Sequence, residues 1–384
     1  MKKTEFLLTP VVGKYFVGRE ELITELVKEL GNPRSRIGFC LYGRRRVGKT
    51  SVLMEVKDHL ANKKDVVVAY LSLYDIADLT IETVGQEIIN AVMSAYQEKN
   101  LLPFTVKIRK LLEAPTDLVT ELLLNTKIET TVLEHIKILL EYKQGKRNYT
   151  NYIRDVFNTG DVLGKATSTK CVIVLDEFPE MTKIENGMQI VKILRTQYEK
   201  QEKTALVISG SIKKTLETVA LSEASPFYKQ LVPKHVLPFS KEEVGRFLSL
   251  YLGKTKEDEV EKLYQLTGGL PFYLQFIGRS SGYVGGIDEA IDKFLQQEGG
   301  LFFKEEIEKL TEKEKWIVVG LSGGHKTLTE LAEEVKEPAT TVGRYLPELI
   351  GKEIVLRESR GTYELLDKMF GLWLRKTYWH EYNQ

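Results

Sequence analysis

At residues 41–51 the chain reads Leu41-Tyr42-Gly43-Arg44-Arg45-Arg46-Val47-Gly48-Lys49-Thr50-Ser51, which fits the P-loop pattern G-x-x-x-x-G-K-[ST]. Gly43 and Gly48 let the backbone curl so that successive amide N–H groups point at a phosphate. Lys49 brings a positive charge to the β- and γ-phosphates of a nucleotide, and the Thr50 hydroxyl is suited to hold Mg²⁺. Thr50 also opens a predicted helix, whose N-terminus favours an anion, so the stretch predicts nucleotide binding.

The sequence around this loop alternates between short apolar runs and helical periodicity. Apolar runs that suit buried strands lie at 37–42, 65–72, 170–175 and 204–211, with a shorter run at 234–238. Helical patterns flank these runs at 22–30, 49–60 and 185–200. Strands that alternate with helices predict an α/β fold with a parallel, doubly wound sheet.

Residues 75–165 differ from the rest of this region, because apolar positions recur there at helical spacing and strand signals are absent. We predict a helical insertion between the second and third strands. Within it, residues 142–154 mix cations with aromatic side chains. This segment is either a contact for nucleic acid or another polyanion, or a solvated linker between helices, which is the commoner role of mixed polar turns.

The chain beyond residue 240 is dominated by helical patterns. Capping-box sequences at Ser240–Glu243 and Thr311–Glu314 predict helix starts, and Pro271 is placed to begin a helix after a glycine break. Three helices and a hairpin near the C-terminus form the pattern of a winged helix-turn-helix. We therefore expect three domains, listed here with their bounds: 1–239 with the insertion at 75–165, a helical domain at 240–308, and a winged helix at 309–384.

Two carboxylates, Asp176 and Glu177, follow the apolar run at 170–175, where a parallel sheet presents its ligand site. Asp176 is placed to bind Mg²⁺ together with Thr50, directly or through water. Glu177 is placed to polarise a water for attack on the γ-phosphate, as a general base. Ser209 ends the next strand, so its hydroxyl either reaches the γ-phosphate or the attacking water, or is an ordinary strand-end serine. The predicted catalytic set is Lys49, Asp176, Glu177 and Ser209.

The other chemically active side chains give weaker signals. The loop arginines at 44–46 either touch phosphate or a neighbouring chain, or face solvent. Cys40 and Cys171 lie in apolar runs, so we expect buried small hydrophobes rather than a disulfide or a metal site. The histidines show no ligand spacing, so no metal other than Mg²⁺ is expected; they are His59, His135, His235, His325 and His380.

Composition limits the classes of protein that this chain can be. Its 55 basic and 54 acidic residues give a net charge of +1, which argues against a globally basic nucleic-acid binder. The N-terminus lacks the apolar core of a signal peptide, and no run approaches the roughly 18 apolar residues of a membrane span, so we expect a cytoplasmic protein. Residues 311–384 hold 11 Lys/Arg against 12 Asp/Glu, so DNA binding by the winged helix is expected to be weak.

Several short segments, taken together, resemble the archaeal ATPase family, which belongs to the STAND group of AAA+-related P-loop ATPases. Besides the P-loop they are Phe16-Val17-Gly18-Arg19-Glu20, Val172-Ile173-Val174-Leu175-Asp176-Glu177-Phe178-Pro179, Ile208-Ser209-Gly210-Ser211 and Gly268-Gly269-Leu270-Pro271. Only the P-loop is specific for a nucleotide, so the match depends on the order of the segments. The resemblance extends from residue 10 to the C-terminus and is weakest across 75–165. It implies an AAA+-like ATPase core, a helical lid and a winged helix, in that order.

The resemblance also implies roles for residues outside the P-loop. Val17, Gly18 and Arg19 would lie against the adenine and ribose, Ser209 would hold the sensor position, and Pro271 would close the lid over the nucleotide. The nucleotide-binding set is then Val17, Gly18, Arg19, Arg46, Val47, Gly48, Lys49, Thr50, Ser51 and Pro271. In such ATPases ADP holds a closed monomer, and ATP with a ligand opens it for assembly. The match places no arginine finger, and Arg279 is the one candidate for a second sensor, so hydrolysis by the monomer is expected to be slow.

Three functions therefore compete. The first is Mg²⁺-dependent ATP hydrolysis that acts as a molecular switch, slow alone and stimulated by an unidentified protein partner or by DNA. The second is a nucleotide-sensing regulator that reads DNA through the winged helix, and the third is a DNA repair or replication ATPase that acts as a ring. The resemblance favours ATP and ADP over guanine nucleotides. Weak DNA contacts through 142–154 or the winged helix, and an ATP-dependent oligomer, stay open.

Overall fold

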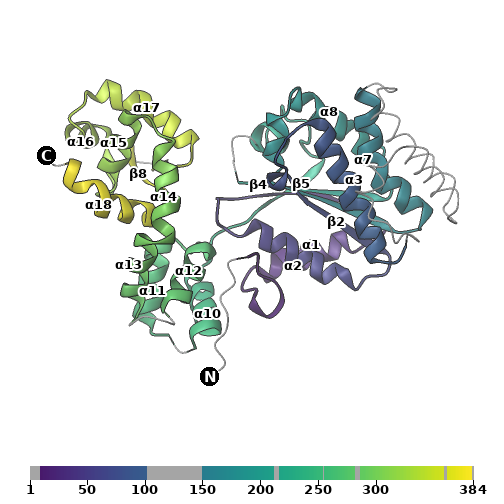
Figure 1. The fold of residues 1–384 in the computed structure, drawn as a ribbon, viewed down its shortest axis with the longest axis horizontal. Helices are drawn as coiled ribbons and strands as arrows, with labels where there is room; N and C mark the ends of the chain where they lie inside the picture. Colours follow the sequence, from purple (N-terminus) through teal and green to yellow (C-terminus); the bar gives the residue numbers. More distant parts are fainter. Residues whose placement is uncertain are drawn as a thin grey trace. The chain divides into compact units, whose positions relative to one another are not determined.

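The structure, a computed structural model, describes residues 9–101, 149–211, 216–253, 255–281, 286–358 and 361–382. By its internal contacts the chain divides into two compact units, Pro10–Leu237 and the remainder, which is mainly Pro238–Gln384. Figure 1 shows the helices and strands of both units.

The first unit is built on a five-stranded sheet in which every neighbouring pair of strands is parallel. Its spatial order is β2 (Val66–Ser72), β3 (Lys170–Asp176), β4 (Thr204–Gly210), β1 (Gly38–Tyr42) and β5 (Leu231–His235). β3 and β4 are buried along their whole length, which fits their nearly continuous runs of Val, Ile and Leu. The predicted parallel α/β sheet is confirmed.

Helices cover both faces of this sheet (Figure 1). One face carries α1 (Glu20–Leu30) and α2 (Lys49–Ala61), and the other carries α3 (Ile81–Glu98), α7 (Tyr149–Ala166) and α8 (Gly187–Tyr198). The second group shares one apolar cluster with the sheet, in which Tyr96, Phe157 and Phe178 are buried. Short turns complete the unit: the 3₁₀ turns η1 (Gly13–Tyr15), η2 (Leu73–Asp75) and η3 (Phe178–Lys183), and the π-helical turn η4 (Glu217–Leu221).

The described part of the predicted insertion is mainly helical, in α3 and α7, and its residues 102–148 lie outside the described residues. The segment 142–154, which mixes cations and aromatic side chains, also lies partly outside the described residues. Its described part, 149–154, begins α7. Tyr152 is only 4% exposed. A Cβ at Gly85 would come within 2.5 Å of the Tyr152 hydroxyl, so the two helices are in close contact there. This aromatic side chain therefore packs in the core rather than toward a polyanion.

The predicted fifth strand is present, but it lies three residues earlier than the predicted range 234–238. The strand is β5, Leu231–His235, and it forms one edge of the sheet beside β1. Val232, Pro233 and His235 are exposed there, and an edge strand tolerates a proline because its outer N–H groups need no partner in the sheet. The apolar pattern misplaced the strand because it reports burial, and β5 is mostly exposed.

The second unit is made of helices and one small sheet. α10 and α15 begin with the predicted reciprocal capping boxes at Ser240–Glu243 and Thr311–Glu314, and Pro271 begins α12 as predicted. The first group of helices is α10 (Lys241–Leu252), α11 (Glu257–Thr267), α12 (Pro271–Ser281), α13 (Ile287–Gln296) and α14 (Glu298–Glu308). The division of this unit at residue 308 stays a prediction.

The C-terminal part of the second unit combines helices with an antiparallel sheet of order β6-β8-β7. In chain order its elements are α15 (Glu312–Leu321), β6 (Lys326–Thr327), α16 (Leu328–Glu334), α17 (Ala339–Gly351), β7 (Val355–Arg357), β8 (Thr362–Leu365) and α18 (Lys368–Tyr382). The sequence did not indicate β6, because two residues show no periodicity. Phe370 and Trp373 of α18 pack on Phe303 of α14, with ring centroids 5.4 and 5.8 Å apart.

Both cysteines lie buried in the sheet of the first unit and are free, as predicted. Cys40 is on β1 and Cys171 on β3. Burial raises the pKa of each thiol to about 12, so neither forms a thiolate at neutral pH. Both act as small apolar residues.

The second unit contains a fully buried carboxylate, Glu314, at the start of α15. The amide and the hydroxyl of Thr311 both donate to it at 2.9 Å, and the ammonium of Lys352 lies 2.6 Å away. Burial acts to raise the pKa of this carboxyl, but the hydrogen bonds from Lys352 and Thr311 outweigh burial and hold the pKa of Glu314 below its ordinary value.

We expect Glu314→Gln to lower the free energy of unfolding by about 1–3 kcal/mol, because Lys352 and the Thr311 donors lose a charged acceptor. Tryptophan fluorescence during urea unfolding measures this unit alone, since the tryptophans are Trp316, Trp373 and Trp379. Because the pKa is depressed in the folded state, the difference from wild type should be full near neutral pH. It should shrink as the pH falls through the folded pKa.

The matched control is Glu330→Gln, which changes the equivalent capping box of α16, where Thr327 is the partner and Glu330 is exposed. Glu330→Gln should lower the free energy of unfolding clearly less than Glu314→Gln does. Equal costs at the two sites would show that burial of Glu314 adds nothing to its capping bond.

Candidate active site

The P-loop connects the carboxyl end of β1 to the start of α2. Arg46 and Gly48 both have left-handed backbone, with φ of 67° and 90°. At Gly43 a Cβ would lie 2.4 Å from the carbonyl oxygen of Val236, so the position has room for a hydrogen only. The two glycines of the motif therefore occupy positions where the loop requires them.

Lys49 opens α2 with its side chain inside the loop, where the residue is only 5% exposed. Its ammonium donates to the carbonyl oxygens of Gly43 and Arg44, both at 3.2 Å. Arg44 and Arg46 are half-buried, whereas Arg45 is exposed. The structure thus holds the predicted phosphate-binding lysine at the centre of the loop.

Asp176 ends β3, and its carboxylate accepts hydrogen bonds from hydroxyl groups on three other elements. The hydroxyls of Thr50 and Tyr70 donate to one carboxylate oxygen at 2.7 and 2.8 Å, and the Ser209 hydroxyl donates to the other. Asp176 is 2% exposed, so these bonds replace the water that its charge would otherwise need. Thr50 comes from α2, Tyr70 from β2 and Ser209 from β4.

The oxygens of Thr50 and Asp176 form a donor set that suits Mg²⁺, which prefers hard oxygen ligands and one or two carboxylates beside phosphate. Their separation of 2.7 Å shows that both reach the same point next to the P-loop. These are the two residues that the sequence predicts as metal ligands. A magnesium ion held there would neutralise charge on the β- and γ-phosphates of ATP.

Glu177 follows Asp176 with a left-handed backbone, φ 52°. Burial raises the pKa of its carboxyl, and the nearby Lys49 ammonium offsets part of this rise. The Ser211 hydroxyl donates to it at 3.3 Å. A general base works best with a pKa near the working pH, so the environment of Glu177 suits the role that the sequence predicts.

Three contacts at this site were not predicted from the sequence. Tyr70 lies in an apolar run of the sequence. The one feature that could have indicated its contact is that a tyrosine hydroxyl in a buried strand needs a hydrogen-bond partner. Ser211 bonds to Glu177, and Ser209 bonds to Asp176 in this structure. The role of Ser209 as a sensor of the γ-phosphate stays a prediction.

The segment at 17–19 lies beside the P-loop. Gly18 and Arg19 have left-handed backbone, and the Arg19 guanidinium donates to the carbonyl oxygen of Val47 and, at 3.2 Å, to that of Leu237. Before this segment, the amide of Val11 donates at 3.2 Å to the hydroxyl of Ser51, just after the loop. Contact of this segment with adenine stays a prediction. Pro271 belongs to the second unit, and its place over the nucleotide stays a prediction too.

Residues Asn62-Lys63-Lys64-Asp65 spell N-K-x-D, a pattern that is associated with guanine recognition. They follow α2, which starts at the P-loop, and they precede β2. The tetrapeptide therefore lies at the amino ends of the parallel strands, away from the P-loop by the length of a 13-residue helix, about 20 Å. From this position it cannot contact a base bound at the loop.

A family model described as an ATPase domain found predominantly in Archaea matches residues 16–277. The match covers the P-loop, Asp176, Glu177 and Ser209. The chain belongs to this family. It is accordingly a P-loop ATPase, as the motifs predicted, and it binds a nucleotide.

Solved structures support the same assignment of fold. The Walker-type ATPase PABY2304 of Pyrococcus abyssi matches with a TM-score of 0.70 and 19% identity, over 96% of this chain and 99% of that one. The ORC2 protein of Aeropyrum pernix, in ADPNP–ADP complexes, matches with a TM-score of 0.53 and 12% identity, over 93% and 94%. No curated protein matches the chain by sequence. Within the described residues, no helix is long and apolar enough to cross a membrane.

We expect Glu177→Gln to lower ATP turnover by about 10²–10⁴-fold, because an amide cannot accept the proton of the attacking water. Nucleotide binding should persist, since Lys49 and the loop are unchanged. In the wild type, kcat/KM should rise with pH through the raised pKa of Glu177, because the base acts when deprotonated. The pH below which kcat/KM falls should therefore be higher than for an ordinary glutamate. The residual turnover of the variant should not show this fall.

The control is Glu180→Gln on η3, whose carboxylate pairs with Lys183 at 2.6 Å and which should keep full turnover. Phosphate release and binding of a fluorescent ADP analogue measure both quantities on the same samples. Full turnover in Glu177→Gln would exclude it as the base.

We expect Tyr70→Phe to raise the Mg²⁺ concentration needed for half-maximal turnover by about tenfold or more, because Asp176 loses one of the groups that orient it. Turnover at saturating Mg²⁺ should change less. Tyr74→Phe is the matched control, since Tyr74 is 67% exposed. A lower melting temperature with an unchanged Mg²⁺ requirement would mean that Tyr70 only stabilises the fold.

Proposed function

We propose that this ATPase is a nucleotide-controlled molecular switch that depends on Mg²⁺ and turns over slowly without a partner. The observation that carries the proposal is the contact between the P-loop and the segment by which the chain leaves the first unit. Leu237 is the last residue of that unit, and Pro238 begins the second. A change in the loop therefore acts directly on the connection between the two units.

Contacts on both sides of the loop support this coupling. The amide of Val236 donates to the carbonyl oxygen of Tyr42 at 2.7 Å, and its own carbonyl closes the space at Gly43. Arg19 bridges the carbonyl oxygens of Val47, in the loop, and Leu237, in the exit segment. The exit segment is thus hydrogen-bonded to the residue before the loop, packed against the first glycine of the loop, and connected through Arg19 to Val47.

We expect slow turnover by the isolated chain because no arginine finger is assigned to its site. An arginine that stabilises the transferred phosphoryl group is worth about 10³–10⁵-fold in rate. The nearby cation that acts on Glu177 is Lys49. We propose that a partner completes the site.

A DNA-binding regulator is the second candidate, favoured by the arrangement of α15, α16 and α17 with the sheet β6-β8-β7, which we interpret as a winged helix at 309–384. The charges of this C-terminal part argue against DNA binding. The recognition helix would be α17, whose charged residues are Arg344 and Glu348. If duplex DNA neither binds at low salt nor changes turnover, this candidate fails.

The switch is tested by comparing the size and shape of the full chain with ADP and with a non-hydrolysable ATP analogue, by sedimentation and X-ray scattering. We expect the two states to differ in compactness or assembly. Arg19→Asn should reduce that difference because the bridge to Leu237 is lost. The comparison is made at nucleotide concentrations that saturate the variant, since Arg19 is also predicted to contact the nucleotide. Asparagine suits the test since it tolerates the left-handed backbone at this position.

Arg34→Asn, at an exposed arginine, is the control and should behave as wild type. Identical wild-type states with both nucleotides would refute the switch. If Arg19→Asn responds to the two nucleotides as the wild type does, the switch proposal stands, but Arg19 does not couple the loop to the exit segment.

A further inference from the structure

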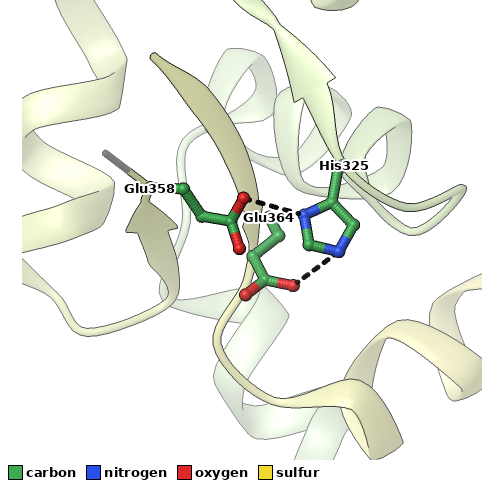
Figure 2. A group of neighbouring side chains, drawn as sticks. All are labelled: His325, Glu358 and Glu364. Carbon is green, nitrogen blue, oxygen red and sulfur yellow. Dashed lines mark ion pairs between the residues drawn. The ribbon is translucent and has the colours of Figure 1, made fainter. Parts of the chain in front are cut away.

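Three side chains on the small sheet of the second unit lie next to one another (Figure 2). His325 directly precedes β6, Glu358 directly follows β7, and Glu364 lies on β8. Nδ1 of His325 is 3.5 Å from a carboxylate oxygen of Glu358, and its Nε2 is 3.3 Å from one of Glu364. One potential ligand atom from each side chain lies within 4.8 Å of the other two.

The strand register explains why these residues meet. The β6–β8 ladder pairs Lys326 with Tyr363, so the next pair outward is His325 with Glu364. The β7 residue opposite Glu364 lies two positions before Glu358. Paired residues, and residues two apart on one strand, share a face of a sheet. All three side chains therefore project from the same face.

We propose that His325, Glu358 and Glu364 bind a divalent transition-metal ion, for which Zn²⁺ is the best fit. One imidazole nitrogen with two carboxylate oxygens is a donor set that zinc accepts, and three protein ligands leave a position for water. Tetrahedral zinc with bonds of about 2.0–2.1 Å holds its ligand atoms about 3.3 Å apart. The two carboxylates contact different ring nitrogens here, so one of them must rotate toward the nitrogen that binds the ion.

Charge balance favours a divalent ion over an ion pair among the three residues. Glu358 and Glu364 bring two negative charges to one imidazole, which offsets a single charge even when protonated. The Thr362 hydroxyl donates to the Glu358 carboxylate at 3.1 Å, in the manner of the outer groups that orient metal ligands. No other group of three His, Cys, Asp or Glu side chains in the described part of the chain has ligand spacing.

A bound ion would connect all three strands of this sheet. β6 has two residues and β7 has three, so backbone hydrogen bonds alone secure them weakly. An ion that binds the folded sheet and not the unfolded chain stabilises the fold in proportion to its occupancy. The site would thus secure the start of β6 to the β7–β8 hairpin.

The test is calorimetric titration of the chelator-treated full chain with Zn²⁺, in the presence of saturating Mg²⁺ and ADP to occupy the P-loop. We expect one Zn²⁺ per chain, and loss of this binding in His325→Gln and in Glu364→Gln. His59→Gln is the matched control, because His59 pairs at 3.2 Å with Glu55 alone. Binding should also weaken in acid, where protons compete for the imidazole nitrogen.

A second measurement follows unfolding of this unit by tryptophan fluorescence. Zn²⁺ should raise the melting temperature of the wild type and of His59→Gln, and leave that of His325→Gln unchanged. Equal Zn²⁺ binding by wild type and His325→Gln would overturn the proposal. So would the absence of Zn²⁺ binding by the wild type, which would leave an ion-pair cluster only.

Discussion

The buried carboxylate of Asp176 sets the requirements that the rest of the first unit meets. A charge removed from water is costly unless hydrogen bonds replace its hydration. The donors here come from α2, β2 and β4, through Thr50, Tyr70 and Ser209. β2 and β4 must therefore flank β3, and α2 must begin within reach of its end. The strand order β2-β3-β4-β1 satisfies both conditions.

Adjacent carboxylates at the end of β3 acquire different properties from their surroundings. Asp176 continues the strand and is surrounded by hydroxyl donors. Glu177 turns away through a left-handed backbone, which costs about 1–3 kcal/mol in a non-glycine residue. It enters a half-buried position with Lys49 and Ser211 as neighbours, and this burial raises its pKa. One residue is thus suited to hold a cation and the next to accept a proton, a separation of roles that depends on environment alone.

The sequence predicted the elements whose signals are local and missed those that depend on pairing. Continuous apolar runs identified β3 and β4, and the P-loop spacing located Lys49 and Thr50. β5 was displaced because an exposed edge strand has no burial pattern. Tyr70 could not be assigned to Asp176, since β2 and β3 are separated by nearly a hundred residues and their pairing leaves no trace in either strand. The same reason hides His325, whose neighbours follow from a sheet register and not from spacing along the chain.

Gly43 shows how the site and the connection between the units constrain one residue. In the P-loop motif, Gly43 lets the backbone curl so that amide N–H groups can point at a phosphate. In this fold the Val236 carbonyl lies 2.4 Å from where its Cβ would be, so a side chain here would displace the exit segment even without nucleotide. The amide of Val236 is already bonded to Tyr42, one residue before the glycine. The first glycine of the loop and the exit segment are therefore in direct contact, and the size of one limits the path of the other.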